Sequence, residues 1–87
     1  MQQQTGIPGG TIAYTDAGTG NAVVLVHGFG EDGRIWQEQV AALSPYYRCI
    51  VPDLPGSGNS SITEQPFETS TEAMAVALSD LLVTMNI

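Results

Sequence analysis

The feature that most constrains the fold is an apolar run without alternation of apolar and polar residues, Ala22-Val23-Val24-Leu25-Val26. A run of this kind, rich in β-branched residues, is typical of a strand buried on both faces of a parallel sheet. A loop with three glycines, residues 27–33, follows it. Because parallel strands need a crossover to join them, the run predicts a strand–loop–helix–strand unit.

The helix of this unit is predicted over Arg34–Leu43, where Trp36, Val40 and Leu43 recur at helical spacing on one apolar stripe. Asp32 or Gly33 is expected to cap its start. Ser44-Pro45 ends the helix, because a residue before proline avoids helical dihedral angles. The next strand is predicted over Tyr47–Val51. It contains the only cysteine, Cys49, interpreted as a buried strand residue.

The rest of the chain adds a hairpin before this unit and a helix after it. Gln2–Ile7 and Thr11–Thr15 are expected to pair across a Pro-Gly-Gly turn. Ile62–Glu68 is expected to be an irregular connection. Thr69 and Glu72 form a capping box before the last helix. That helix has one apolar face, made of Met74, Ala77, Leu78, Leu81, Leu82 and Met85. The predicted order is therefore β-β-β-α-β-α within one α/β domain, residues 1–87.

Charge and composition restrict the partners of such a chain. Its 87 residues include 2 Lys plus Arg against 9 Asp plus Glu, a net charge of −7. This balance argues against binding to nucleic acid or to an anionic membrane surface. Met1–Thr5 has neither the basic residues nor the apolar segment of a signal peptide, so we expect a cytoplasmic protein.

The glycine loop allows two interpretations. Gly28, Gly30 and Gly33 satisfy G-x-G-x-x-G, and Asp53 lies where a ribose-binding acid would follow a dinucleotide fingerprint. Glu31 and Asp32, however, put two negative charges into the loop that would hold a diphosphate. The dinucleotide interpretation is therefore the weakest of those we consider.

The second interpretation is a resemblance. Three features of the chain are similar to the α/β-hydrolase superfamily. They are the run Val23–Gly30 ending in His27-Gly28-Phe29-Gly30, Trp36 on the helix, and the loop Val51-Pro52-Asp53-Leu54-Pro55-Gly56-Ser57-Gly58-Asn59-Ser60. The resemblance covers nearly the whole chain. It implies the N-terminal third of a three-layer α/β-hydrolase domain, with sheet order 1-2-4-3.

The resemblance also implies a chemistry. Enzymes of this type act on an ester, a thioester or a related carbonyl substrate. Gly30 stands where epoxide hydrolases and haloalkane dehalogenases carry proline, which favours an esterase-like or carbon–carbon bond hydrolase. No metal and no organic cofactor is implied. The expected partner of the complete enzyme is a small-molecule substrate.

By the same resemblance, the Phe29 backbone N–H would supply half of an oxyanion hole. Gly28 and Gly30 would let the backbone turn and aim that N–H. His27 is expected to be structural and bonded to neighbouring loops, and Trp36 to pack on the core or shape the pocket. A simpler interpretation makes Phe29 an apolar plug whose N–H is not used.

Asp53, Gly56 and Gly58 are expected to hold their own loop. Ser57, Ser60 and Ser61 lack a G-x-S-x-G context, so none is expected to be a nucleophile. The nucleophile, the acid and the catalytic histidine of a complete hydrolase are all absent from the chain.

We therefore expect a fragment that is inactive alone. The resembled fold would border the strand Val23–Val26 with a further strand, so its edge is expected to be exposed. This predicts self-association, or pairing with the missing C-terminal part. A non-catalytic interaction module is the alternative.

Overall fold

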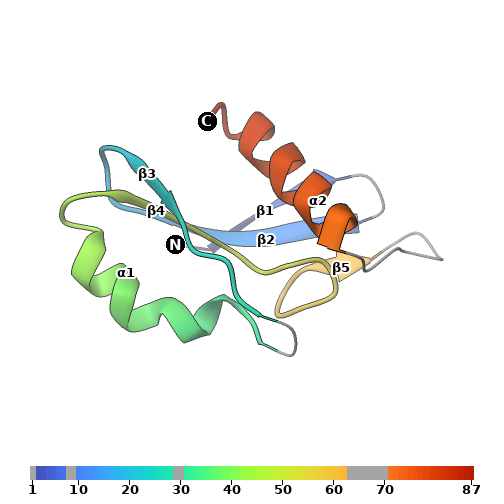
Figure 1. Cartoon of the computed structure of the whole chain (residues 1–87), viewed down its shortest axis with the longest axis horizontal. Helices are drawn as coiled ribbons and strands as arrows, with labels where there is room; N and C mark the ends of the chain where they lie inside the picture. The colour runs from blue at the N-terminus through green and yellow to red at the C-terminus, as the bar shows by residue number, and fades with distance from the viewer. Residues whose placement is uncertain (1, 8–9, 29–30, 63–70) are drawn as a thin grey trace.

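The computed structural model describes residues 2–7, 10–28, 31–62 and 71–87. They form one mixed sheet in the order β1-β2-β4-β3 (Figure 1). Its strands are β1 (Gln2–Ile7), β2 (Gly10–Ala17), β3 (Ala22–Val24) and β4 (Arg48–Pro52). Strand β2 runs antiparallel to β1 and β4, whereas β3 and β4 are parallel. The predicted order 1-2-4-3 is confirmed.

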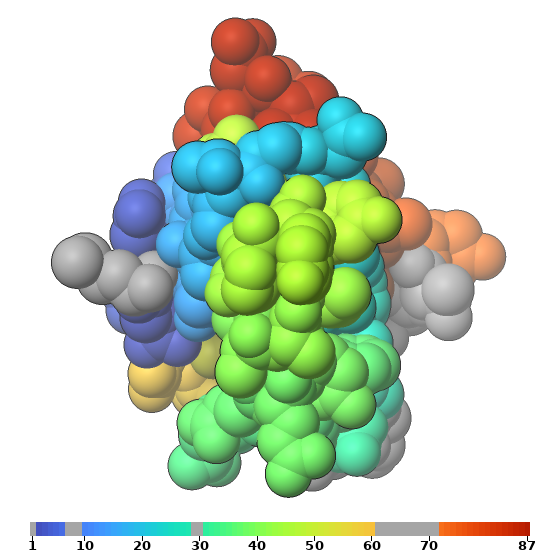
Figure 2. All heavy atoms as spheres, turned by 90° about the vertical axis from the view of Figure 1, so that its left-hand side faces the viewer, coloured from blue at the N-terminus to red at the C-terminus, as the bar shows by residue number. Residues whose placement is uncertain are grey.

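Helices cover both faces of this sheet. A 3-10 turn, η1 (Gly33–Trp36), leads directly into α1 (Gln37–Leu43), and α2 (Thr71–Thr84) follows later. Figures 1 and 2 show α1 (green) and α2 (red) on opposite sides of the strands. The predicted three-layer arrangement is confirmed. The Asp32 side chain accepts a hydrogen bond from the Arg34 N–H and caps η1, as expected.

The buried core lies between β2 and α2. Ile12, Tyr14 and Leu81 form its centre, with Leu78 and Met85 packed against it. Because strand side chains alternate between faces, the Ile12 and Tyr14 side chains point to α2, while their neighbours in β2 point to the α1 side. The predicted apolar face of the last helix is confirmed by its buried members.

Strand β4 is the most completely buried strand. Its residues from Cys49 to Pro52 are all buried, and the Cys49 side chain is fully so. This confirms that Cys49 is a structural residue of a central strand. The predicted strand was displaced by one residue, since pairing begins at Arg48 and continues through Pro52.

Other details of the prediction were wrong. The strand predicted over residues 22–26 ends as β3 at Val24, although the Leu25 N–H still donates to the Ile50 carbonyl. Ser61–Ile62, predicted to be loop and connection, form β5 and pair with Gly10 and Thr11 of β2. A two-residue strand is too short to show a period in the sequence. Thr69 of the expected capping box lies outside the described residues.

Strand β3 forms one edge of the sheet. Among the described residues it pairs with β4 alone. The apolar run continues past β3 to Val26, whose surface is 42% exposed. Among the described residues this apolar edge is therefore open, as the resemblance implied.

Candidate active site

Two loops meet where the parallel strands end. Strand β3 leads into residues 25–32, and β4 leads into the loop of residues 53–60 (Figure 1). Both strands run in the same direction, so both loops leave the sheet at its carboxyl end. In open α/β sheets, ligands bind in the crevice outside this end. The geometry therefore marks these two loops as the candidate site.

His27 joins the two loops. The side chain is buried, and its Nε2 accepts a hydrogen bond from the Leu54 backbone N–H at 2.8 Å. Since Nε2 is the acceptor, the ring proton is on Nδ1, which lies 2.8 Å from the Gly28 carbonyl oxygen and donates to it. Both ring nitrogens are engaged by backbone groups. Neither is available to act as a base, which fits a structural role.

Asp53 is the centre of a second set of contacts. The residue is only 5% exposed. Its Oδ1 accepts from the Gly33 N–H at 2.7 Å, and its Oδ2 accepts from the Asn59 N–H at 3.0 Å. The first bond reaches the start of η1, and the second closes Asp53's own loop. Asp53 thus links the glycine loop to the loop that follows β4.

Ser60 fastens this loop to the sheet. Its hydroxyl donates to the Asp53 carbonyl oxygen at 2.6 Å and accepts from the Ala13 N–H at 2.8 Å. The Asp53 N–H in turn donates to the Ala13 carbonyl at 2.8 Å. The side chain is buried with both functions of its hydroxyl engaged, an arrangement that suits a structural serine and not an exposed nucleophile.

Two glycines allow these close approaches. Gly58 has φ 52, and a Cβ there would collide with the Asp53 carboxylate. A Cβ on Gly33 would lie 3.0 Å from both Asp53 Oδ1 and Val51 Cγ1. Gly56, also expected to shape the loop, has φ 81. The positive φ favours glycine at positions 56 and 58, whereas the short distances to Asp53 and Val51 favour it at position 33.

Acidic side chains occupy the N–H groups that a diphosphate would need. Glu31 Oε1 accepts from the Gly28 N–H at 3.0 Å, and Asp32 Oδ1 accepts from the Arg34 N–H at 2.8 Å. The Gly33 N–H is bound by Asp53. A dinucleotide fingerprint leaves such groups free for phosphate. The dinucleotide interpretation therefore has no support in the geometry of this loop.

The remaining predicted site residues are less completely placed. Phe29, the expected oxyanion donor, and Gly30 lie outside the described residues. Trp36 is half-buried at the end of η1. Its Nε1 is buried and finds no acceptor within the part of the chain that the structure describes. A buried donor without a partner is uncommon, so this N–H is open to an acceptor from elsewhere.

Both arginines are bound to neighbouring carboxylates. Arg34 Nη2 lies 2.8 Å from Asp32 Oδ2, and Arg48 Nη2 lies 2.7 Å from Asp16 Oδ2. The hydrogen bond from Arg34 is the main cause that lowers the pKa of Asp32, and that from Arg48 lowers the pKa of Asp16. The sequence contains no other Lys or Arg.

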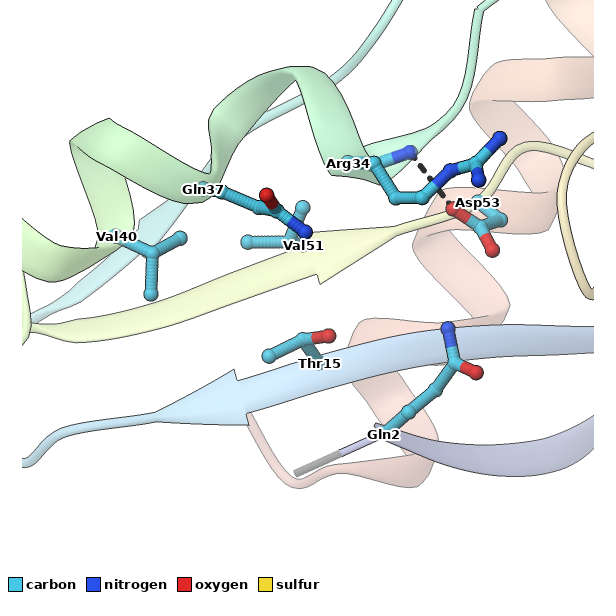
Figure 3. A pocket seen from close by; sticks show the side chains of 8 residues that line it. Gln2, Thr15, Arg34, Gln37, Val40, Val51 and Asp53 are labelled. Carbon is cyan, nitrogen blue, oxygen red and sulfur yellow. Dashed lines mark hydrogen bonds between the residues drawn. The ribbon is translucent and has the colours of Figure 1, made fainter.

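A hollow of about 190 Å³ lies on the α1 side of the sheet, next to Asp53. Figure 3 shows Val40 and Val51 on one side of it and Gln2 and Thr15 on the other. Its residues come from β1, β2, β4, the η1–α1 segment and the loop after β4. The lining mixes apolar and amide side chains with the charged Arg34 and Asp53, and the described residues contain no group of three or more potential metal ligands.

Some contacts were not anticipated from the sequence. The Glu31 bond to Gly28 had a visible signal, because a carboxylate three residues after a turn's first residue matches capping-box spacing. The Ser60 bridge and the Asp16–Arg48 pair had none, since each joins residues distant in the sequence.

Among the described helices, none is long and apolar enough to cross a membrane.

Comparisons with known proteins agree with this architecture. The family described as alpha/beta hydrolase fold matches residues 21–86. The pimeloyl-[acyl-carrier protein] methyl ester esterase of Vibrio campbellii is 50% identical over 50 residues, which are 58% of this chain and 20% of that enzyme.

Solved structures extend the similarity across the whole chain. A thermophilic esterase from Thermogutta terrifontis matches with a TM-score of 0.84 at 38% identity, over 99% of this chain and 32% of that one. A haloalkane dehalogenase loop variant from Bradyrhizobium elkanii matches with a TM-score of 0.90 at 26% identity, over 100% and 29%. The chain thus spans about a fifth to a third of its relatives. The chain belongs to the α/β-hydrolase fold family.

Proposed function

We propose that the chain is the N-terminal segment of an enzyme that hydrolyses an ester, a thioester or a related carbonyl substrate, and that it contributes half of the oxyanion hole. The observation that carries the proposal is the His27–Leu54 hydrogen bond. It holds the turn after β3 against the loop after β4, at the carboxyl end of the parallel strands. We infer that the residues after His27 present a backbone N–H to a reacting carbonyl.

The Phe29 N–H is the proposed donor. A tetrahedral intermediate of acyl transfer carries a negative oxygen, and a fixed N–H in a dry site stabilises it better than water does. Removing one such donor costs about 3–4 kcal/mol in enzymes where it has been measured. The second donor, the nucleophile, the acid and the catalytic histidine are proposed to lie in a part of the enzyme beyond residue 87.

The class of substrate is narrowed by the turn and by charge. Gly30 takes the place of the proline in epoxide hydrolase and dehalogenase turns, and the esterase relatives point the same way. Both arginines of the segment are already bound to carboxylates. This segment therefore offers no free cation to an anionic substrate, which favours a neutral carbonyl compound in its half of the site.

Strand β3 supports the further proposal that the segment needs a partner. Its open edge and the exposed Val26 require a strand from the remainder of a longer chain, or from a second copy when the segment is alone. The same edge is what favours the alternative, a non-catalytic interaction module. The two differ in whether the full-length gene product carries a nucleophilic serine.

Labelling with a fluorophosphonate, which reacts with activated serines, tests the proposal. In the full-length product we expect one modified serine, located by peptide mass spectrometry beyond residue 87. We expect none at Ser57, Ser60 or Ser61. A full-length product that is not labelled and hydrolyses no ester would contradict the enzymatic proposal and favour the interaction module.

A further inference from the structure

The only histidine of the chain joins two loops through its ring nitrogens. His27 Nε2 accepts a hydrogen bond from the Leu54 N–H at 2.8 Å, and Nδ1 donates to the Gly28 carbonyl oxygen at 2.8 Å. The contact with Gly28 stays within the loop after β3. The contact with Leu54 is the one that reaches the loop after β4, so this connection depends on the lone pair of Nε2.

The Leu54 contact can form in only one protonation state of the ring. An imidazolium carries a proton on both nitrogens, so it can donate hydrogen bonds but cannot accept them. A proton on Nε2 of His27 would therefore face the Leu54 N–H, with one donor against another. The proton on Nδ1 is present in both states, so the bond to Gly28 is kept. Histidine ordinarily titrates at about pH 6.5, which makes this change accessible in mild acid.

The charged side chains on the elements around the ring are mostly acidic. The loop after β3 carries Glu31 and Asp32, the loop after β4 carries Asp53, and η1 carries Arg34. Arg34 is already bound to Asp32. Asp32 also lies close enough to attract a positively charged ring. Because these carboxylates can balance the charge of the ring, acid is expected to act on the Leu54 hydrogen bond.

We propose that the His27–Leu54 contact is an acid-sensitive switch, in which protonation of the ring releases the Leu54 N–H and frees the loop after β4 from the turn after β3. The bond from the Gly33 N–H to Asp53 and the contacts of Ser60 do not involve His27. The release is therefore local and leaves the sheet in place. The inference goes beyond the proposed function, because it concerns backbone contacts of the described residues and no reaction.

Amide hydrogen exchange in the 87-residue chain, followed by NMR at about pH 7.5 and about pH 5, tests this on both sides of the ordinary histidine value. The protection of the Leu54 amide, corrected for the intrinsic pH dependence of exchange, should fall about tenfold in acid because one hydrogen bond is lost. The midpoint of this fall should coincide with the titration of the His27 ring protons, which give the only histidine signals of the chain. The Asp53 amide, which donates to the Ala13 carbonyl, is the internal control and should keep its protection.

Two variants separate the switch from a general effect of acid. His27→Gln offers a side-chain carbonyl that cannot be protonated in this range, so the protection of the Leu54 amide should be the same at both pH values. His27→Ala removes the acceptor, so the protection should already be about tenfold lower near neutral pH and should fall no further in acid. The inference would be overturned by a wild-type Leu54 amide that is equally protected in both conditions, by a joint loss at Leu54 and Asp53, or by an acid-dependent loss in either variant.

Discussion

The carboxyl end of the parallel strands, here called the loop end, differs from the β3 edge in how many of its polar groups have hydrogen-bond partners. At the loop end, His27, Asp53 and Ser60 bond to backbone groups of β2, of η1 and of both loops. At the β3 edge, the backbone groups that face away from β4 have no strand beside them among the described residues. The polar groups of the first region are bound within the described residues, and we propose that those of the second bind a partner strand.

His27, Asp53 and Ser60 find their hydrogen-bond partners within the described residues. The outer edge of β3 has no strand beside it among those residues. We therefore expect substitutions at the loop end to lower the stability of the fold most. Substitutions at the β3 edge should instead change the self-association of the chain.

Asp53→Ala should have the largest effect on stability. It removes the buried acceptor of two backbone N–H groups, from Gly33 and Asn59, and should lower the free energy of unfolding by about 3 kcal/mol. Urea denaturation followed by circular dichroism measures this. The loss for Asp53→Asn, which keeps one acceptor oxygen, should lie between zero and the loss for Asp53→Ala. A loss no larger than that of the exposed Glu38→Ala control would contradict the central role of Asp53.

Gly58→Ala tests the close approach of the backbone at position 58 to the Asp53 carboxylate. With φ 52 and no space beside the Asp53 carboxylate, alanine should cost about 2 kcal/mol. Gly6→Ala is its matched control, because a Cβ on Gly6 meets nothing within 4 Å. The control should stay within about 0.5 kcal/mol of wild type. Equal melting temperatures for the two variants would show that the loop is not rigid.

Val26→Lys tests the open edge. A charge beside an unpaired strand opposes edge-to-edge pairing, so this variant should weaken self-association of the 87-residue chain about tenfold. Sedimentation velocity over a range of concentrations measures the change. Val83→Lys adds the same charge on α2, at a residue 74% exposed, and should leave association as it is. A wild-type chain that stays monomeric at every concentration would contradict the prediction.

Acid should produce the smallest effect, through the Asp16–Arg48 pair. Bonding to Arg48 lowers the pKa of Asp16 below its ordinary 3.8 in the folded chain. Its contribution to stability is therefore complete above pH 3.8 and is lost as the pH falls through the lower, folded value. In Asp16→Asn, the melting temperature should change less with pH over that acid range. An identical acid profile for wild type and variant would rule out the linkage.

The fold was largely predictable from periodicity and turn residues. The apolar run at Ala22–Val26 and the stripe of Trp36, Val40 and Leu43 placed a crossover unit, and the resemblance supplied the strand order. The features that could not be predicted were very short elements and pairings between residues distant in the sequence. β5 has only two residues, and the one-residue displacement of β4 follows from the pairing of Pro52 with β2 and of Arg48 with β3.

The candidate site was predicted less completely. Asp53 and His27 were expected to be structural, and the sequence does not specify which backbone groups they bind. Their partners, Gly33 and Leu54, lie 20 and 27 residues away. Such contacts follow from the parallel pairing of β3 and β4, which brings both loops to one end of the sheet. The role of Phe29 stays a prediction.

Hydrolysis of p-nitrophenyl acetate by two proteins side by side tests the central claim most directly. One is the full-length gene product, and the other is the 87-residue chain. We expect the full-length product to turn over the ester and to lose most of this activity when Phe29-Gly30 is deleted, while the 87-residue chain shows none. Specific turnover by the 87-residue chain, or undiminished turnover by the deletion variant, would contradict it.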